Sequence, residues 1–181
     1  RMGDFIMKYI TEKAVRAYSK VQVKISEQLL KDPVRSSDFK NFKDMKGLII
    51  TWHLREKKQE RPKAFFGGKI YLLTDNMTFS SASDLAAMFR DYECGRIIGY
   101  ETGGLPTCFG DVLSRTLRNS GIQVGVSCKK FYGPRPKPGD EEHGVLPDIP
   151  ATEAMLAKYK TSDPVLSFAA DYIMRVERVM H

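Results

Sequence analysis

Residues 69–90 read KIYLLTDNMTFSSASDLAAMFR, and the period of their apolar residues changes halfway along. The run 70–73 is short, apolar and partly β-branched or aromatic, which is typical of a buried strand. After Ala82 the apolar residues recur at helical spacing, at Leu85, Met88, Phe89 and Tyr92. The hydroxyl residues between the two patterns therefore lie at the N-terminus of a predicted helix, where unpaired backbone N–H groups can be capped or can bind an oxyanion.

Further segments extend this strand–helix pattern. A second short strand is predicted at 96–99, followed by the glycine-rich loop 102–104. Runs at 112–117 and 122–126 flank Arg118-Asn119-Ser120-Gly121, which is typical of a β-hairpin. Short strand–helix–strand connections favour an α/β fold with a mostly parallel central sheet, in which 69–73 is a central strand. The sequence also predicts strands at 21–25 and 47–54, helices at 5–17 and from Asp163-Pro164 onward, a polar segment without a pattern at 31–46, and a proline-rich loop at 131–144.

Length and composition indicate one globular domain, with 181 residues, 42% hydrophobic and 28% charged. The net charge of +7 arises in residues 1–65, which hold 16 Lys and Arg against 8 Asp and Glu. Because acids are interspersed there, we expect a solvated face and no nucleic-acid partner. No apolar run approaches the roughly 18 residues of a membrane span. The three cysteines are an odd number without metal-ligand spacing, so we expect no metal and no disulfide scaffold. We also expect no cofactor.

Three motifs together carry a family resemblance. They are TFSSASDLAAMFRDYECGRIIGYETGG at 78–104, LRNSGIQVGV at 117–126 and EEHGVLPDIPAT at 141–152. In this order they resemble the nucleophile region, the hairpin and the Glu-x-x-Gly-Val-x-Pro-Asp-Ile signature of the C-terminal processing (tail-specific) serine peptidases. The matches lie within residues 69–152, about half of the chain. The resemblance implies a crotonase-like (ClpP/crotonase) α/β fold with a mostly parallel central sheet and flanking helices, and a serine endopeptidase that forms an acyl-enzyme.

The resemblance also implies roles for individual residues. The nucleophile is the first Ser of the family's Ser-Ala-Ser-Glu, which is Ser81 here, with Asp84 in place of the Glu. The backbone N–H of Ala82 is one oxyanion donor. Ser80 remains an alternative nucleophile, and otherwise Ser80 and Ser83 are expected to be cap or packing residues.

The general base distinguishes two branches of the family. The best-known members place a Lys just after the Thr-x-Gly loop, where this chain has Leu105-Pro106. The tricorn-like branch lacks that Lys and uses a His, helped by a Glu near the Gly-Val-x-Pro-Asp signature. The resemblance to this branch gives Glu141 as the acid, with Glu142 as the runner-up. The histidines available as a base are His53, His143 and His181, while the family's own His lies upstream of a segment that this chain does not contain.

We therefore expect residues 1–181 to be the C-terminal part of a single peptidase domain, without the His base and one oxyanion donor. The basic region 1–65 holds a helix and a strand insertion, 66–152 form the catalytic core with the nucleophile, and 153–181 form the C-terminal helix. The substrate would be a peptide or unfolded protein, and the resemblance suggests an exported or periplasmic bacterial protein. The alternative is a non-catalytic ligand- or peptide-binding module of the same fold. A Ser at the nucleophile position favours the peptidase, and the missing base favours the binding module.

Overall fold

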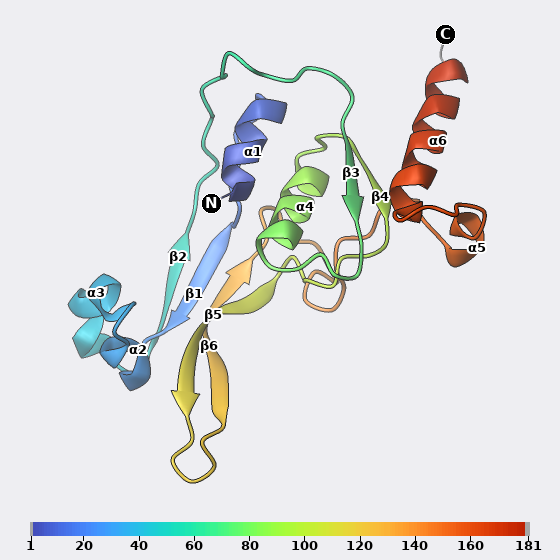
Figure 1. Ribbon diagram of the computed structural model, residues 1–181. Coiled ribbons are helices and arrows are strands. Elements are labelled where there is room, and N and C mark those ends of the chain that lie inside the picture. Colours follow the sequence, from blue (N-terminus) through green and yellow to red (C-terminus); the bar gives the residue numbers. More distant parts are fainter. Residues whose placement is uncertain (1, 180–181) are drawn as a thin grey trace.

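The structure is a computed structural model that describes residues 2–179, and it is a mixed α/β arrangement with two sheets (Figure 1). The helices are α1 Met2–Ile10, α2 Glu27–Lys31, α3 Ser36–Phe39, the 3₁₀ helix η1 Lys40–Met45, α4 Ser81–Asp91, α5 Glu153–Leu156 and α6 Pro164–Val179. The strands are β1 Lys20–Lys24, β2 Ile49–His53, β3 Tyr71–Thr74, β4 Arg96–Gly99, β5 Cys108–Thr116, β6 Gln123–Tyr132 and β7 Ile149–Pro150. No helix within residues 2–179 is long and apolar enough to cross a bilayer.

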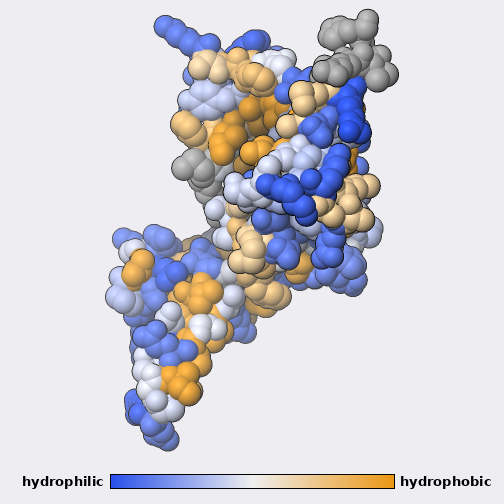
Figure 2. All heavy atoms as spheres, turned by 45° about the vertical axis from the view of Figure 1, so that its right-hand side comes forward, coloured by the Kyte–Doolittle hydropathy of each residue, from blue (hydrophilic) through white to orange (hydrophobic). Residues whose placement is uncertain are grey.

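The larger sheet has four strands in the order β2-β1-β6-β5, and each neighbouring pair is antiparallel. Buried side chains of β1 alternate with more exposed ones, which places Val21 and Val23 in the core. Leu29 of α2 and Phe131 of β6 pack in the same cluster. The hairpin of β5 and β6 is the predicted one, and its far end extends beyond the register with β1 (Figure 1). Apolar side chains along this projecting arm are exposed (Figure 2), among them Leu117, Ile122 and Val126.

The smaller sheet has three strands in the order β3-β4-β7, and both pairs are parallel. Helix α4 is the crossover between β3 and β4, as parallel pairing requires. Ala86 and Phe89 of α4 pack against Ile97 of β4, and the other side of α4 packs against α1 through Met88 and Met7. The sequence motifs therefore supply a parallel β–α–β unit that fixes the start of α4.

The predicted sheet arrangement needs two corrections. Strand β3 lies at an edge of its sheet, and β4 is the central strand. The chain as a whole is not mostly parallel either, because the four-stranded sheet is antiparallel. Both differences arise from long-range pairing. The pairing of β7 with β4 and of β1 with β6 joins segments that local periodicity does not connect.

The N-terminal region also differs from the prediction. Helix α1 ends at Ile10 and does not continue to residue 17, because Val15 instead forms an antiparallel bridge with Lys57. The segment 31–46, predicted as polar and patternless, forms α3 and η1. Phe39 and Phe42 from these short helices contact the ring of Trp52 on β2, so the segment covers one edge of the larger sheet.

Candidate active site

A tight turn joins the β3 side of the smaller sheet to α4. The backbone N–H of Ala82 donates to the carbonyl of Phe79 at 3.1 Å, which closes the turn. Ser80 occupies its first central position with φ 54° and ψ −127°, close to the values of a type II′ turn. Glycine is the residue that ordinarily takes this conformation, and a side chain there costs on the order of 1–3 kcal/mol. The start of α4 is therefore strained.

Two glycines bring the loop 102–104 against this turn. The N–H of Gly104 donates to the carbonyl of Thr78 at 2.9 Å. A Cβ atom on Gly104 would lie 2.3 Å from Ser83 Oγ, and one on Gly103 would lie 2.2 Å from the carbonyl oxygen of Asn76. Only glycine fits at either position, so the Thr-x-Gly motif has a packing reason to follow the serine motif.

The same loop is tied to the third motif. The N–H of Thr102 donates to the carbonyl of Val145 at 3.1 Å, and the N–H of Val145 donates to Thr102 Oγ1 at 2.8 Å. The N–H of Gly144 donates to Glu101 Oε1 at 2.7 Å. The serine turn, the glycine loop and the Gly-Val signature, which are far apart in the sequence, therefore form one hydrogen-bonded unit.

A cleft of about 950 Å³ opens beside this unit. Ser80 and Ser81 lie on one wall, and the beginning of β5 and the end of β6 form the opposite wall. Glu141 also lines the cleft. The remaining lining residues are Tyr18, Phe79, Ser83, Asp84, 103–105, 107–111 and 129–131. The cleft thus lies between the two sheets and combines hydroxyl, carboxylate, ammonium and aromatic groups.

The structure brings Ser81 and Glu141, the proposed nucleophile and acid, into this cleft together with the alternative nucleophile Ser80. Ser81 is the first residue of α4 and is exposed, as predicted for a residue in the first turn facing a groove. Glu141, in the predicted loop 131–144, lines the same cleft. Ala82 is exposed as well, but its N–H already donates to Phe79 in the turn. Glu142 is exposed and is not among the described residues that line the cleft.

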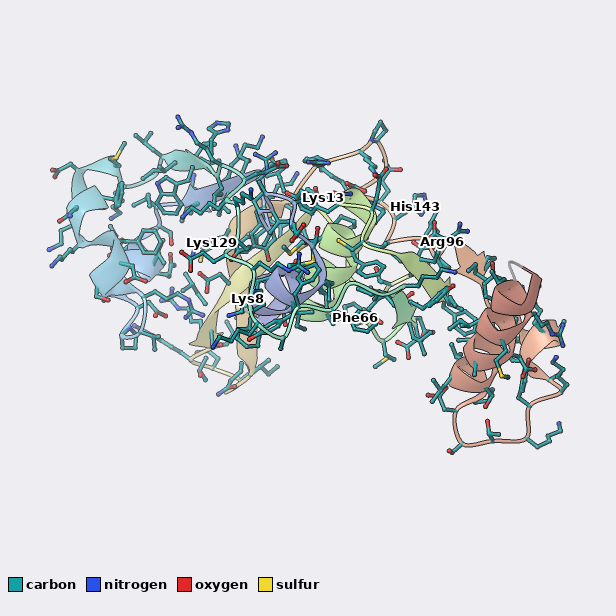
Figure 3. All side chains as sticks on the ribbon, turned by 90° about the horizontal axis from the view of Figure 1, so that it is seen from above. Lys8, Lys13, Phe66, Arg96, Lys129 and His143 are labelled. Atoms are coloured by element: carbon teal, nitrogen blue, oxygen red, sulfur yellow. The ribbon has the colours of Figure 1, made fainter. Side chains whose placement is uncertain are left out.

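The histidines lie elsewhere. Neither His53 on β2 nor His143 is among the described residues that line the cleft. His143 Nδ1 lies 3.7 Å from Glu101 Oε1, and in Figure 3 His143 is well to one side of Lys129, which does line the cleft. His181 lies outside the described residues. Within residues 2–179, no group of three or more His, Cys, Asp or Glu side chains is arranged to hold a metal.

Two ion pairs lie in the cleft, Lys130 with Glu141 and Lys129 with Asp111. Lys130 Nζ donates to Glu141 Oε2 at 2.7 Å, and this hydrogen bond raises the pKa of Lys130. Lys130 therefore remains a cation at neutral pH and is unsuited to act as a base there. On the same wall, burial would raise the pKa of Asp111, but hydrogen bonds from Lys129 and Arg35 outweigh burial and lower it. The sequence had suggested neither pair, because no local pattern marks the partners of a side chain across a cleft.

The loop that carries Glu141 is anchored by a second ionic cluster that sequence reasoning missed. Arg90 of α4 makes a bidentate pair with the buried Asp140, at 2.8 and 3.1 Å, and also donates to the buried Asp91 at 2.8 Å. Asp140 Oδ2 in turn accepts the N–H of Lys137 at 2.8 Å. The residue before Glu141 is therefore fixed to the C-terminal end of the helix that begins at Ser81.

A serine hydroxyl at a strained turn before a helix, beside a cleft, is an arrangement that supports acyl transfer to serine. The family model described as "Peptidase family S41" matches residues 19–151. The chain therefore belongs to peptidase family S41.

Solved structures give a fold comparison at low identity. Mature CPAF complexed with lactacystin has 14% identity and a TM-score of 0.57, over 97% of this chain and 40% of that one. A photosystem II D1 C-terminal processing protease has 15% identity and a TM-score of 0.48, over 85% of this chain and 31% of that one. A lipoprotein from Streptococcus agalactiae has 14% identity and a TM-score of 0.41, over 96% and 49%. The chain spans less than half the length of each of these proteins, and no curated protein sequence matches it.

Proposed function

We propose that the protein is a serine endopeptidase of the tricorn-like branch, with a crotonase-like fold, acting on peptides or unfolded protein. The chain contributes the nucleophile at the start of α4, at the Ser81 position that the family motif designates or at its neighbour Ser80. The observation that carries the proposal is the shared cleft. Ser81 and Glu141 are distant in the sequence, are designated by separate family motifs, and line the same cavity.

The reaction begins when the serine Oγ forms a bond to the scissile carbonyl carbon. Its proton passes to a general base, and the carbonyl oxygen becomes an oxyanion beside the N-terminus of α4, where free N–H groups and the helix dipole stabilise negative charge. The C–N bond then breaks, and the departing amine takes the proton from the base. Water hydrolyses the acyl ester, which releases the new carboxyl terminus and returns a proton to the serine.

Glu141 is the proposed orienting acid. The family resemblance pairs it with an imidazole base. Lys130 holds the carboxylate of Glu141 at the edge of the cleft at 2.7 Å. A carboxylate held in this position can accept a hydrogen bond from an imidazolium and stabilise its charge in the transition state.

The test uses the protein expressed from its complete gene, with denatured casein as substrate. We expect hydrolysis by the wild type and none by the double variant Ser80→Ala/Ser81→Ala, because that variant has no hydroxyl at the proposed nucleophile positions. Circular dichroism establishes that the variant is folded. Undiminished hydrolysis by the folded double variant would exclude the proposed nucleophiles. Casein binding by a wild type that cannot hydrolyse it would favour the binding module.

A further inference from the structure

We infer that Ser80, rather than Ser81, is the nucleophile, and that the backbone N–H of Ser81 is an oxyanion donor. The inference rests on the proposed function, since it concerns which of two adjacent hydroxyls reacts. Ser80 has φ 54° and ψ −127° inside the turn that begins α4. A nucleophilic serine on a sharp, strained strand-to-helix turn is the arrangement that exposes Oγ above the helix N-terminus. Ser81, in contrast, is already the first helical residue.

The side chain of Ser80 has no structural task that would explain the strain. It is the N-cap residue of α4, yet its hydroxyl makes no capping hydrogen bond. Two other N-cap residues of this chain do make one. Ser26 accepts the N–H of Leu29 at 3.1 Å, and Thr152 accepts that of Met155 at 3.4 Å; both have extended backbone conformations. Among the described residues, the Ser80 hydroxyl therefore has no capping partner and is available for chemistry at the cleft, at a position where glycine would have relieved the strain.

The backbone N–H groups of the turn also favour Ser80 over Ser81 as the nucleophile. If Ser81 were the nucleophile, the N–H of the next residue, Ala82, would face the oxyanion, but it already donates to Phe79 at 3.1 Å. If Ser80 is the nucleophile, the next N–H is that of Ser81, which has no acceptor among the residues that the structure describes. In a type II′ turn the N–H of the second central residue points outward, away from the hydrogen bond that closes the turn. The turn thus leaves Ser81 N–H available to the oxyanion.

The assignment changes which atoms react, not the course of the reaction. Ser80 Oγ bonds to the carbonyl carbon, its proton passes through the base to the departing amine, and the C–N bond breaks. The ester on Ser80 is then cleaved by water, which supplies the hydroxyl of the product acid and the proton that returns to Oγ. The Ser81 N–H donates to the oxyanion in both tetrahedral intermediates.

The complete gene product, labelled with a fluorophosphonate and analysed by tandem mass spectrometry, tests the assignment. The serine oxygen forms a bond to the phosphorus of this probe, fluoride leaves with the serine proton, and the phosphonyl group stays on the serine, so the modified residue is identified directly. We expect the label on Ser80. Ser80→Ala should abolish both labelling and casein hydrolysis, whereas Ser81→Ala should still be labelled on Ser80 and should keep at least about a tenth of the wild-type kcat. Label on Ser81 that survives Ser80→Ala would overturn the inference and leave the proposed function intact.

The variant Ser80→Gly separates the backbone strain at this position from the role of the hydroxyl. Ser80→Gly should raise the melting temperature by about 2 °C or more, because glycine accepts this conformation, while hydrolysis is lost. Ser80→Ala is the matched control, since it loses the hydroxyl but keeps the strain and should not gain stability. A Ser80→Gly protein that hydrolyses casein normally would overturn the inference. Hydrolysis that persists in the folded Ser80→Ala/Ser81→Ala variant would overturn the proposed function as well.

Discussion

Glu141 is the residue whose environment most constrains the chemistry after the serines. Its carboxylate meets Lys130 at 2.7 Å, and both residues line the cleft. Glu141 and the neighbouring Glu142 are both exposed, but Glu142 is not among the described residues that line the cleft. Two adjacent acids of the same type thus have different surroundings, so the chain provides its own control for the role of a carboxylate at this point.

We predict that Glu141→Gln lowers kcat for casein by about tenfold or more, with little change in KM. The reason is that the proposed hydrogen bond to the charged base forms mainly in the transition state. Steady-state kinetics on the complete gene product measure both parameters, and Glu142→Gln is the matched control. A lower kcat in Glu142→Gln alone would assign the role of orienting acid to Glu142. Full activity in both variants would remove the acid from the mechanism.

At the scale of elements, the C-terminal end of α4 holds the loop that carries Glu141. Arg90 bridges Asp91 and Asp140, and both carboxylates are buried. We predict that Asp140→Ala destabilises the fold by about 3 kcal/mol, because it leaves the half-buried guanidinium without its bidentate partner. Urea unfolding measures the change. The double variant Arg90→Met/Asp140→Leu should recover part of the loss, and a purely additive double variant would contradict the pairing.

Tyr92 at the end of α4 gives a pH-dependent prediction. Burial raises the pKa of Tyr92 to about 12, from an ordinary value of 10.0. The folded protein therefore holds the phenolic proton more tightly than the unfolded chain. The difference in proton affinity contributes up to about 2 kcal/mol to the free energy of unfolding. This stabilisation is fully present below pH 10 and is lost as the pH rises from 10 to 12.

Tyr92→Phe tests this linkage. The variant should be less stable at pH 8 by about 1–3 kcal/mol, because the N–H of Arg16 donates to Tyr92 Oη at 3.0 Å and would lose that acceptor. It should also lose less stability than the wild type between pH 10 and pH 12. Urea unfolding at pH 8, 10 and 12 gives both quantities. Equal losses in the two proteins over the alkaline range would assign the pH dependence to other groups.

Local elements were predictable where local signals agree. The apolar run before the serines, the helical spacing after Ala82 and the turn residues 118–121 each act over a few residues, and β3, α4 and the β5–β6 hairpin follow them. The edge position of β3 and the pairing of Arg90 with Asp140 depend on which distant segments meet, and no local period carries that information. The strain at Ser80 was equally hidden, because a serine before a helix ordinarily predicts an unstrained cap.

At the scale of the whole molecule, the cleft depends on how the two sheets are held together. Its serine wall belongs to the unit built on β3 and α4, and its opposite wall belongs to the antiparallel sheet. Tyr18 spans the two parts. Its ring packs against Phe131 in the core of the larger sheet, with centroids 4.8 Å apart, and its hydroxyl donates to Asp84 in the first turn of α4. This contact fixes the start of α4 relative to β6.

We predict that Tyr18→Phe lowers the rate of fluorophosphonate labelling more than its loss of stability explains, because the serine wall is then less firmly positioned against β5 and β6. The chain contains a matched control in Tyr159, whose hydroxyl donates to Asp171 at 2.7 Å, outside the residues that line the cleft. Each Tyr→Phe change removes one hydrogen bond to a carboxylate. Labelling of the Tyr159→Phe protein should therefore match the wild type at a temperature where both are folded. Equal labelling rates in the two variants would show that Tyr18 stabilises the fold without positioning the nucleophile, and would leave the alignment of the two walls to the backbone hydrogen bonds of the glycine loop.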